Sequence, residues 1–529
     1  MEHQNAIVST ACGKVLGLSS QGLLEFRAVP YAEPPIGELR WKPPVPVRPW
    51  EGVRDCRERG VMPVQHLTGA DVEPYRSDFY YEPLPSMGED CLYLNITVDE
   101  NAPGSKADRP VFVWFHGGGL TTCHTYEPEA DGRAFAEKGI VFVSVEQRLG
   151  IFGYLSLPQL TAEQGTSGNY GLLDQICALE WIRDNIAAFG GDPSNITIGG
   201  QSGGTVKCMS MVLSPKFSVP VRRIILQSGL QWDRPFPSLS EAEQNGLARL
   251  SRLGLAQDAS LDELRALPAE SLLELPEGNP YIDFVTCDGI VLKDASARDG
   301  LLRGACREIP ILCGCNLGEG EYPTPAGKDA FYADFRERLG DLYDTYGFET
   351  LVPANGSTAP ALARRLAAYG LSNLCWTNIM LPRLYGEWSR KALHSDVKNY
   401  VYLFAHRTPS RPCELGTERD EEIQWSWHSS ELWYTFRSLR EGTPPARRWT
   451  AWDYALAEQI NTYWANFIRT GDPNGEGLPY WPSSSDDLGY VLLGDGISGE
   501  TRCGSPLESL MEDYVRRQFG LPPCIRRMK

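Results

Sequence analysis

The sequence feature that most constrains the fold lies between Asn195 and Thr205, where an apolar run leads into two glycines, a glutamine, a serine and two more glycines. Residues 196–198 are β-branched or apolar and predict a short buried strand, whereas residues 205–209 can form a helix. The glycines around Ser202 allow a tight, strained turn, because the backbone before and after the serine passes too close for side chains. We therefore expect a strand, a tight turn and a helix, with the serine hydroxyl held out of a sheet.

Further apolar runs alternate with helical stretches along the chain. The remaining expected strands are residues 111–115, 140–145, 223–227, 310–315 and 400–406. The expected helices are residues 172–186, with a clear apolar stripe, and the stretches around 240–275, 328–346, 358–395 and 450–469. Strands that alternate with helices predict an α/β fold, with a mostly parallel sheet flanked by helices on both faces.

Other segments have a different composition. Residues 1–60 are rich in proline, which favours antiparallel edge strands and loops over helices and central strands. Residues 65–88 form a polar, aromatic loop that could cover a pocket. With no repeat and no dividing linker, the 529 residues are predicted to form one domain with long insertions.

The charge balance excludes some classes of partner. The formal net charge is −18, whereas nucleic acids and anionic membranes bind cationic surfaces. The chain begins without the basic and apolar regions of a secretory signal and contains no apolar run long enough to span a bilayer, so we expect a cytoplasmic location. The 14 cysteines show no metal-ligand spacing, and we expect most of them to be buried thiols, with no bound metal.

A serine nucleophile needs a base, an acid that orients the base, and hydrogen-bond donors for the oxyanion. The donors are predicted in the His-Gly-Gly-Gly run at 116–119, directly after an expected strand, because glycines expose their N–H groups. Loops of this type form the oxyanion hole in lipases and esterases. The N–H groups of Gly118, Gly119 and Gly203 are the candidate donors, although such a run can also be a simple flexible turn.

In proteins that combine such a serine turn with such a glycine run, the catalytic residues follow one another along the chain in the order serine, acid, histidine. We therefore look for the acid and the base among the residues after Ser202. The candidate histidines are His394, His406 and His428, and His428 is favoured because it lies in a loop-like run of small and aromatic residues. For the acid, Glu319 follows the expected strand at 310–315, at the sheet edge where catalytic groups gather. Glu321 is a local competitor that spacing alone does not exclude.

Several further motifs occur in a fixed order. They are Val29-Pro30-Tyr31-Ala32, residues 89–95, residues 168–175, residues 189–193, Gln227-Ser228-Gly229 and residues 471–474. With these motifs, the chain resembles the type-B carboxylesterases, which include bacterial para-nitrobenzyl esterases and cholinesterases, from about residue 7 to residue 482.

The resemblance implies an α/β-hydrolase fold in which helical insertions form a cap over an active-site gorge. It aligns Ser202 with the nucleophile of the family, Glu319 with its acid and His428 with its base. Gly118, Gly119 and Gly203 align with the oxyanion donors. No cofactor or metal is implied.

Some positions depart from the family pattern. Gln201 and Gly203 replace the usual glutamate and alanine, and Gln201 thereby removes a negative charge that would raise the pKa of His428 and attract cationic substrates. The Glu-Gln pair at 146–147 and Cys123 are further replacements, for which the sequence offers no account. Cys91 aligns with a disulfide partner, but the other position of that family disulfide is not cysteine.

These features predict a serine hydrolase that cleaves small-molecule carboxylic esters through an acyl-enzyme. An amidase, or a specialised detoxifying or biosynthetic ester hydrolase, would use the same residues. A third hypothesis is a binding protein, because the same fold is used by adhesion proteins that have lost the triad. The triad candidates Ser202, Glu319 and His428 are all present, which favours the enzyme.

Overall fold

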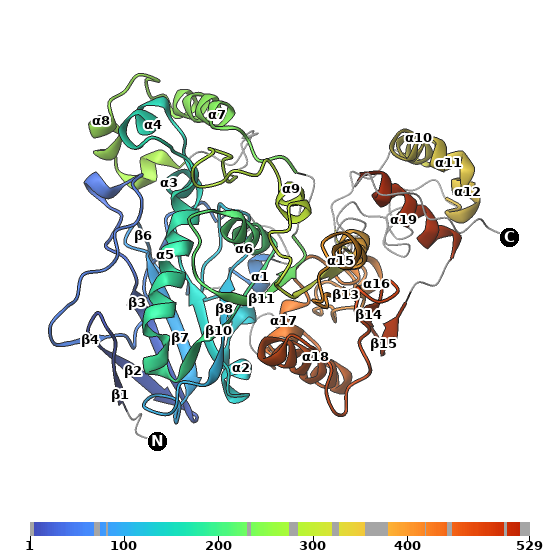
Figure 1. The fold of residues 1–529 in the computed structure, drawn as a ribbon, viewed down its shortest axis with the longest axis horizontal. Helices are drawn as coiled ribbons and strands as arrows, with labels where there is room; N and C mark the ends of the chain where they lie inside the picture. Colours follow the sequence, from blue (N-terminus) through green and yellow to red (C-terminus); the bar gives the residue numbers. More distant parts are fainter. Residues whose placement is uncertain are drawn as a thin grey trace.

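A twisted sheet of 13 strands runs through the molecule (Figure 1). The computed structural model describes residues 5–67, 75–80, 83–229, 234–273, 284–319, 327–354, 379–417, 419–441, 447–501 and 505–518. The strands along the sheet are β1 (Asn5–Ser9), β2 (Lys14–Ser20), β3 (Leu23–Pro30), β7 (Tyr93–Asp99), β9 (Val141–Val145), β8 (Arg109–Phe115), β10 (Gly191–Gln201), β11 (Val221–Gln227), β12 (Ile311–Asn316), β13 (Tyr400–Phe404), β14 (Tyr490–Leu493) and β15 (Ile497–Glu500). β4 (Val53–Asp55) pairs with β2, and β5 (Met62–Pro63) pairs with β6 (Met87–Gly88) apart from this sheet.

The middle of the sheet is parallel, as predicted. From β9 through β8, β10, β11, β12 and β13 to β14, each strand is parallel to its neighbour. Antiparallel pairs form the two ends, which are β1, β2, β3, β7 and β9 on one side and β14 and β15 on the other. The antiparallel strands expected within residues 1–60 are confirmed, with β4 as a parallel addition to β2.

Helices flank the sheet. They are α1 (Tyr75–Asp78), α2 (Arg133–Glu137), α3 (Gly150–Tyr154), α4 (Pro158–Gln164), α5 (Tyr170–Asn185), α6 (Gly203–Leu213), α7 (Leu239–Arg252), α8 (Leu261–Arg265), α9 (Ala297–Leu302), α10 (Lys328–Leu339), α11 (Asp341–Thr345), α12 (Phe348–Leu351), α15 (Leu381–Ala392), α16 (Glu421–Gln424), α17 (Leu432–Thr435), α18 (Ala451–Thr470) and α19 (Pro506–Gln518). Short 3-10 turns are η1 (Gly37–Leu39), η2 (Pro128–Ala130), η3 (Ile186–Phe189) and η4 (Ala269–Leu272). Most of the expected helix around 358–395 lies outside the described residues, and α15 is its described part.

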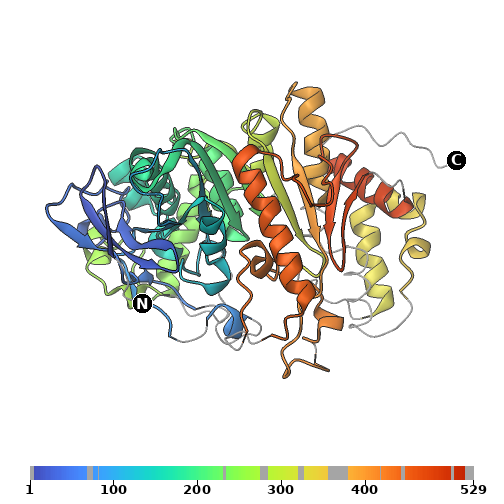
Figure 2. The same ribbon diagram turned by 90° about the horizontal axis from the view of Figure 1, so that it is seen from below.

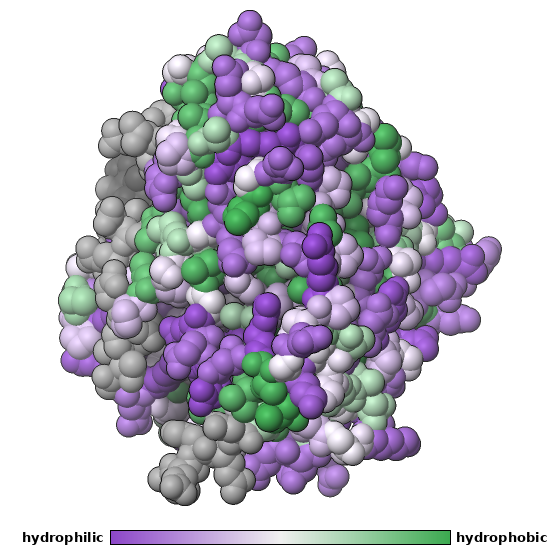
Figure 3. Space-filling view, turned by 90° about the vertical axis from the view of Figure 1, so that its left-hand side faces the viewer, coloured by the Kyte–Doolittle hydropathy of each residue, from purple (hydrophilic) through white to green (hydrophobic). Residues whose placement is uncertain are grey.

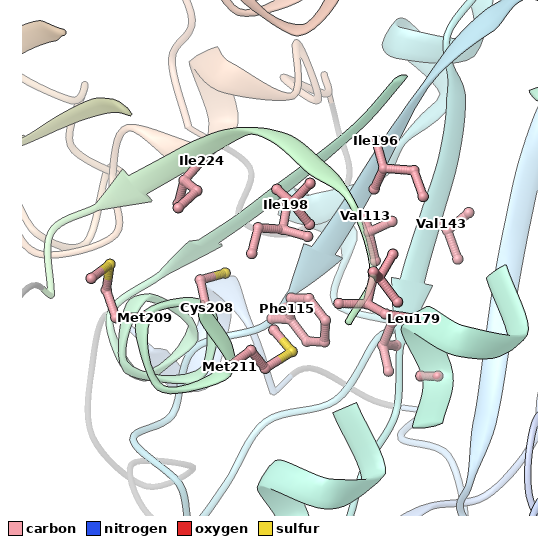
Figure 4. Packing of buried hydrophobic residues seen from close by; sticks show 14 of the residues in the cluster. Val113, Phe115, Val143, Leu179, Ile196, Ile198, Cys208, Met209, Met211 and Ile224 are labelled. Carbon is pink, nitrogen blue, oxygen red and sulfur yellow. The ribbon is translucent and has the colours of Figure 1, made fainter. Parts of the chain in front are cut away.

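The two faces of the sheet bury different side chains of the same strand. In β8, Val111, Val113 and Phe115 belong to the hydrophobic core that contains α5 and α6. Phe112 and Trp114 belong instead to the core that contains α17 and α18. Figure 4 shows the first core, where the side chains of α6 lie against those of β8 and β10. Because side chains alternate along a strand, an apolar strand of this kind needs a helix layer on each face.

Two smaller helical groups lie beside this core. Hydrophobic residues of α3 and α4 pack with those of α7 and α8. Helices α10 to α12 pack with α19 at one end of the molecule (Figure 2). In the described part of the chain, no helix combines the length and the apolar character that a membrane crossing requires. The surface in Figure 3 is mostly hydrophilic, with hydrophobic residues in small groups.

The cysteine prediction agrees with the structure. Every described cysteine is a free thiol, and most of them are buried. Among the described residues, no group of three or more histidine, cysteine, aspartate or glutamate side chains is placed to hold a metal ion.

Candidate active site

Ser202 sits in the tight turn that joins β10 to α6, as the sequence predicts. Its backbone angles are φ 53° and ψ −121°, a conformation that residues other than glycine rarely adopt. The close approaches explain the neighbouring glycines. A Cβ on Gly204 would lie 2.1 Å from the carbonyl oxygen of Phe115, and a Cβ on Gly229 would lie 2.2 Å from that of Ser202. The strain is held by the surrounding backbone, as is usual at functional sites.

The other candidate residues come from separate elements at the carboxyl ends of the parallel strands. The glycine run follows β8, Ser202 follows β10 and Glu319 follows β12. His428 lies in the loop between α16 and α17. The carboxyl edge of a parallel sheet is where such groups converge. Of the other candidates, His406 is bound to Asp453 at 2.8 Å, and Glu321 lies outside the described residues.

Glu319 and His428 lie side by side although they are far apart in the sequence. Oε1 of Glu319 is 3.4 Å from Nδ1 of His428, and the Glu319 side chain is fully buried. Hydrogen bonds tie the histidine loop to the end of β12, because Asn316 Nδ2 donates to the carbonyl of Trp427 at 2.7 Å and Gly318 N donates to that of Ser426 at 3.0 Å. The pairing therefore depends on contacts that no local sequence pattern specifies.

The carboxylate sets the protonation of the histidine. Burial favours the neutral imidazole and lowers its pKa, but the close approach and negative charge of Glu319, with a smaller contribution from the charge of Glu431, outweigh burial, so the pKa of His428 is raised. A second carboxyl, Glu431, lies nearby, and burial together with the charge of Glu319 raises its pKa to about 7. Glu431 accepts a hydrogen bond from Asn316 Nδ2 at 2.5 Å. Sequence reasoning missed the contribution of Glu431, although it stands three residues after His428.

Gln201 contacts the histidine directly. Its Nε2 lies 3.4 Å from Nε2 of His428 and donates to Ser429 Oγ at 2.9 Å. Within the described residues, the hydroxyl of Ser202 makes no hydrogen bond to His428. Hydrogen bonds between a nucleophile and its base are often long until substrate binds.

The contact predicts an effect of charge on the pH profile. Gln201→Glu places a carboxylate beside His428, which favours the imidazolium and raises the pKa of His428 further. If His428 is the base, as the sequence predicts, it must be neutral to act, so kcat/KM falls as pH drops through the pKa of His428. We expect the acid limb of kcat/KM to move to higher pH in Gln201→Glu. Gln257→Glu, an added charge at an exposed position, should leave the limb in place. If the acid limb of kcat/KM does not move in Gln201→Glu, residue 201 does not contact His428 in the way proposed.

The glycine run adopts the open backbone expected of it. Gly118 and Gly119 have φ angles of 74° and 64°, which favour glycine. In the part of the chain that the structure describes, the N–H groups of Gly118, Gly119 and Gly203 donate no hydrogen bond to another residue. A Cβ on Gly203 would lie 1.8 Å from the carbonyl oxygen of Gly119, so the glycine run and the serine turn are in direct contact.

Beneath the glycine run lies a buried polar cluster that accounts for the replacement of residue 147. Lys207 of α6 donates from Nζ to the carbonyl of His116 at 2.9 Å. The amide oxygen of Gln147, in the orientation that satisfies its neighbours, accepts from Lys207 Nζ at 3.2 Å and from His116 Nε2 at 2.6 Å. The Oε1 atom of Glu146 accepts from the backbone N–H of Thr125 at 2.6 Å. Burial lowers the pKa of Lys207 to about 8 and raises that of Glu146 to about 7.

Lys207 is expected to hold the glycine run in place. Among the described residues no carboxylate lies within 4 Å of its Nζ, so its charge is directed at the His116 carbonyl. Lys207→Met removes that anchor, and we expect kcat to fall about 10-fold or more with a smaller change in KM, because a hydrogen bond from a charged donor contributes about 1.5–3 kcal/mol. Initial-rate kinetics test this, with the exposed Lys216→Met as control. Equal kcat in both variants would contradict the anchoring role.

Comparison with known proteins places this geometry in a family. The family model described as the carboxylesterase family matches residues 4–357 and 378–500. The fumonisin B1 esterase of Sphingopyxis macrogoltabida is 32% identical over 510 residues, which cover 94% of this chain and 88% of that protein. Carboxylesterase 1C of Mus musculus is 30% identical over 514 residues, covering 92% and 89%.

The fold agrees with the sequence comparison. A solved structure of a PNB esterase superimposes with a TM-score of 0.76 at 26% identity, covering 96% of this chain and 99% of that one. These esterases have the α/β-hydrolase fold, and the parallel sheet flanked by helices is the same architecture. The chain therefore belongs to the carboxylesterase family and is an ester hydrolase of the serine type.

Proposed function

We propose that this ester hydrolase cleaves small carboxylic esters through an acyl-enzyme formed on Ser202. The observation that carries the proposal is the convergence at one sheet edge of a strained serine turn, a Glu319–His428 pair and a glycine run with unengaged N–H groups. This combination supplies a nucleophile, a base with its orienting acid, and donors for an oxyanion.

In the proposed reaction, His428 removes the proton of Ser202 as its oxygen attacks the ester carbonyl. The N–H groups of Gly118, Gly119 and Gly203 hold the oxyanion. His428 then protonates the leaving alcohol, and water cleaves the acyl-enzyme by the same steps. Glu319 holds the imidazole in one tautomer and stabilises its cationic form, in keeping with the raised pKa of His428.

The absence of a charge on Gln201 favours esters with a neutral alcohol portion as substrates. At this position the family usually has a carboxylate, which would attract a cationic group, whereas Gln201 carries no charge and contacts His428. An amidase or a specialised ester hydrolase would use the same groups. The cytoplasmic location expected from the sequence remains a prediction.

Hydrolysis of para-nitrophenyl esters from acetate to decanoate tests the proposal, alongside the matching para-nitroanilides. We expect saturable ester turnover with one chain-length optimum and much slower anilide cleavage. Faster turnover of the anilides would favour the amidase. The lack of turnover in the whole ester series, from a folded preparation, would contradict the proposed hydrolysis of small esters.

A further inference from the structure

A large polar cavity lies against the antiparallel part of the sheet, away from the serine turn. Its volume is about 720 Å³, within the range of about 300–1,000 Å³ that small-molecule sites occupy. Residues of β3, β7 and β9 line it, together with residues 83–85 and the segment 124–133 that follows the glycine run. Ser202, Glu319 and His428 are not part of its lining, so it is distinct from the proposed catalytic site.

The lining of this cavity carries an excess of positive charge. Three of its arginines share two carboxylates. Glu25 pairs with Arg27 at 2.5 Å and also with Arg133. Asp131 pairs with Arg440 at 3.2 Å and lies 3.7 Å from Arg133. Each carboxylate is thus divided between two guanidinium groups, which leaves donor capacity on the arginines, since each guanidinium has five N–H donors.

A fourth lining arginine, Arg59, pairs with no carboxylate of the described residues. Its guanidinium lies over the ring of Tyr126, 5.3 Å from the centroid, and no carboxylate of the described residues lies within 4 Å of it. The stacked ring restrains the side chain while its N–H donors stay available. Arg59 therefore adds an uncompensated positive charge to the cavity.

Two buried atoms of lining residues, His124 Nε2 and Glu127 Oε1, have no hydrogen-bond partner in the described part of the chain. His124 is 2% exposed, and its Nδ1 accepts from the backbone N–H of Tyr126 at 3.1 Å. Burial and the neighbouring Arg59 lower its pKa to about 4, so the imidazole is neutral and its Nε2 carries the proton. Among the described residues this Nε2–H has no acceptor, and Oε1 of Glu127 has no donor. Burial raises the pKa of Glu127 to about 7, which reduces its repulsion of an anion.

We propose that this cavity binds a small organic polyanion that bears two or more carboxylate or phosphate groups. An oxyanion in the cavity supplies the acceptor that the Arg59 guanidinium lacks among the described residues. Planar guanidinium groups bind carboxylate and phosphate oxygens in pairs, which matches the presence of Arg27, Arg133 and Arg440 in the same lining. The volume accommodates a molecule larger than a single inorganic ion.

Calorimetric titration with citrate and with pyrophosphate tests the proposal, at constant ionic strength and with glycerol as the neutral probe. We expect saturable binding of at least one of the two anions, no binding of glycerol, and an affinity at least about 10-fold weaker in Arg59→Gln, since hydrogen bonds to charged groups contribute about 1.5–3 kcal/mol. The tighter anion identifies the carboxylate or the phosphate as the preferred group. Ser202→Ala should bind the anion as the unaltered protein does, which separates this cavity from the proposed catalytic site.

The matched control is Arg54→Gln. Arg54 is also exposed and stacked on an aromatic ring, at 4.8 Å from the centroid of Trp50, but it does not line the cavity. The substitution Arg54→Gln should leave the affinity for the anion unchanged. If the unaltered protein binds neither anion at 10 mM, or if Arg54→Gln weakens binding as much as Arg59→Gln, the proposal is wrong.

Discussion

Ser202→Ala is expected to lower ester turnover by about 10⁴-fold or more, because it removes the proposed nucleophile while the rest of the site stays in place. The loss should appear in kcat, with KM for the residual reaction little changed. The substitution removes a single oxygen from a residue at the sheet edge, so the thermal unfolding temperature should stay within a few degrees of that of the unaltered protein. Initial rates with a para-nitrophenyl ester measure the effect.

Ser210→Ala is the matched control for this prediction. Ser210 lies on α6, the helix that follows Ser202, and its buried Oγ makes no hydrogen bond to any residue that the structure describes. Its removal should leave turnover unchanged. Turnover of Ser202→Ala that equals that of Ser210→Ala, in preparations free of contaminating esterase, would show that another residue performs the attack.

Gly203→Ala is expected to reduce kcat by about 10²–10³-fold. The new Cβ would lie 1.8 Å from the carbonyl oxygen and 2.6 Å from the Cα of Gly119. Since both atoms belong to the backbone, the glycine run must move, and its N–H groups then leave the positions from which they would bind the oxyanion. Loss of one oxyanion donor costs about 10²–10³ in kcat in other hydrolases. Family members usually have alanine at this position. In this chain the backbone of Gly119 occupies the place of that methyl group.

The control for this substitution is Gly496→Ala. Nothing lies within 4 Å of a Cβ at Gly496, so the added methyl group is accommodated. Affinity for a boronic acid transition-state analogue should fall in parallel with kcat in Gly203→Ala and stay constant in Gly496→Ala. A kcat for Gly203→Ala within two-fold of that of the unaltered protein would contradict the contact between the serine turn and the glycine run.

The sequence was sufficient to predict the centre of the fold. Strands β8, β9 and β11 to β13 and helices α5 and α18 carry strong apolar patterns, and their positions are confirmed to within a few residues. Strand β10 (Gly191–Gln201) is confirmed as a strand but is much longer than the short strand predicted at residues 196–198. Strand β7 was missed, although its residues alternate between buried and half-buried positions, because this stretch was read only as a motif. The short strands β14 and β15 were also missed, because four residues give too brief a pattern to distinguish a strand from a loop.

The candidate site was predictable where local motifs define it. The serine turn and the glycine run have glycines at positions that only their backbone geometry explains. The pairing of His428 with Glu319 required the family resemblance, since it arises from contacts between distant segments. Lys207 and Gln147 meet beneath the glycine run only in the folded chain, so the replacement at residue 147 had no visible cause in the sequence.

The most direct test of the proposed mechanism is peptide mapping after reaction with a serine-directed organophosphonate. The reagent forms a covalent bond with an activated serine, and the site of the bond is read by mass spectrometry. The mechanism predicts one adduct per chain, on the peptide that contains Ser202, and no adduct on Ser202→Ala. An adduct on a different residue, or equal labelling of Ser202→Ala, would contradict Ser202 as the nucleophile.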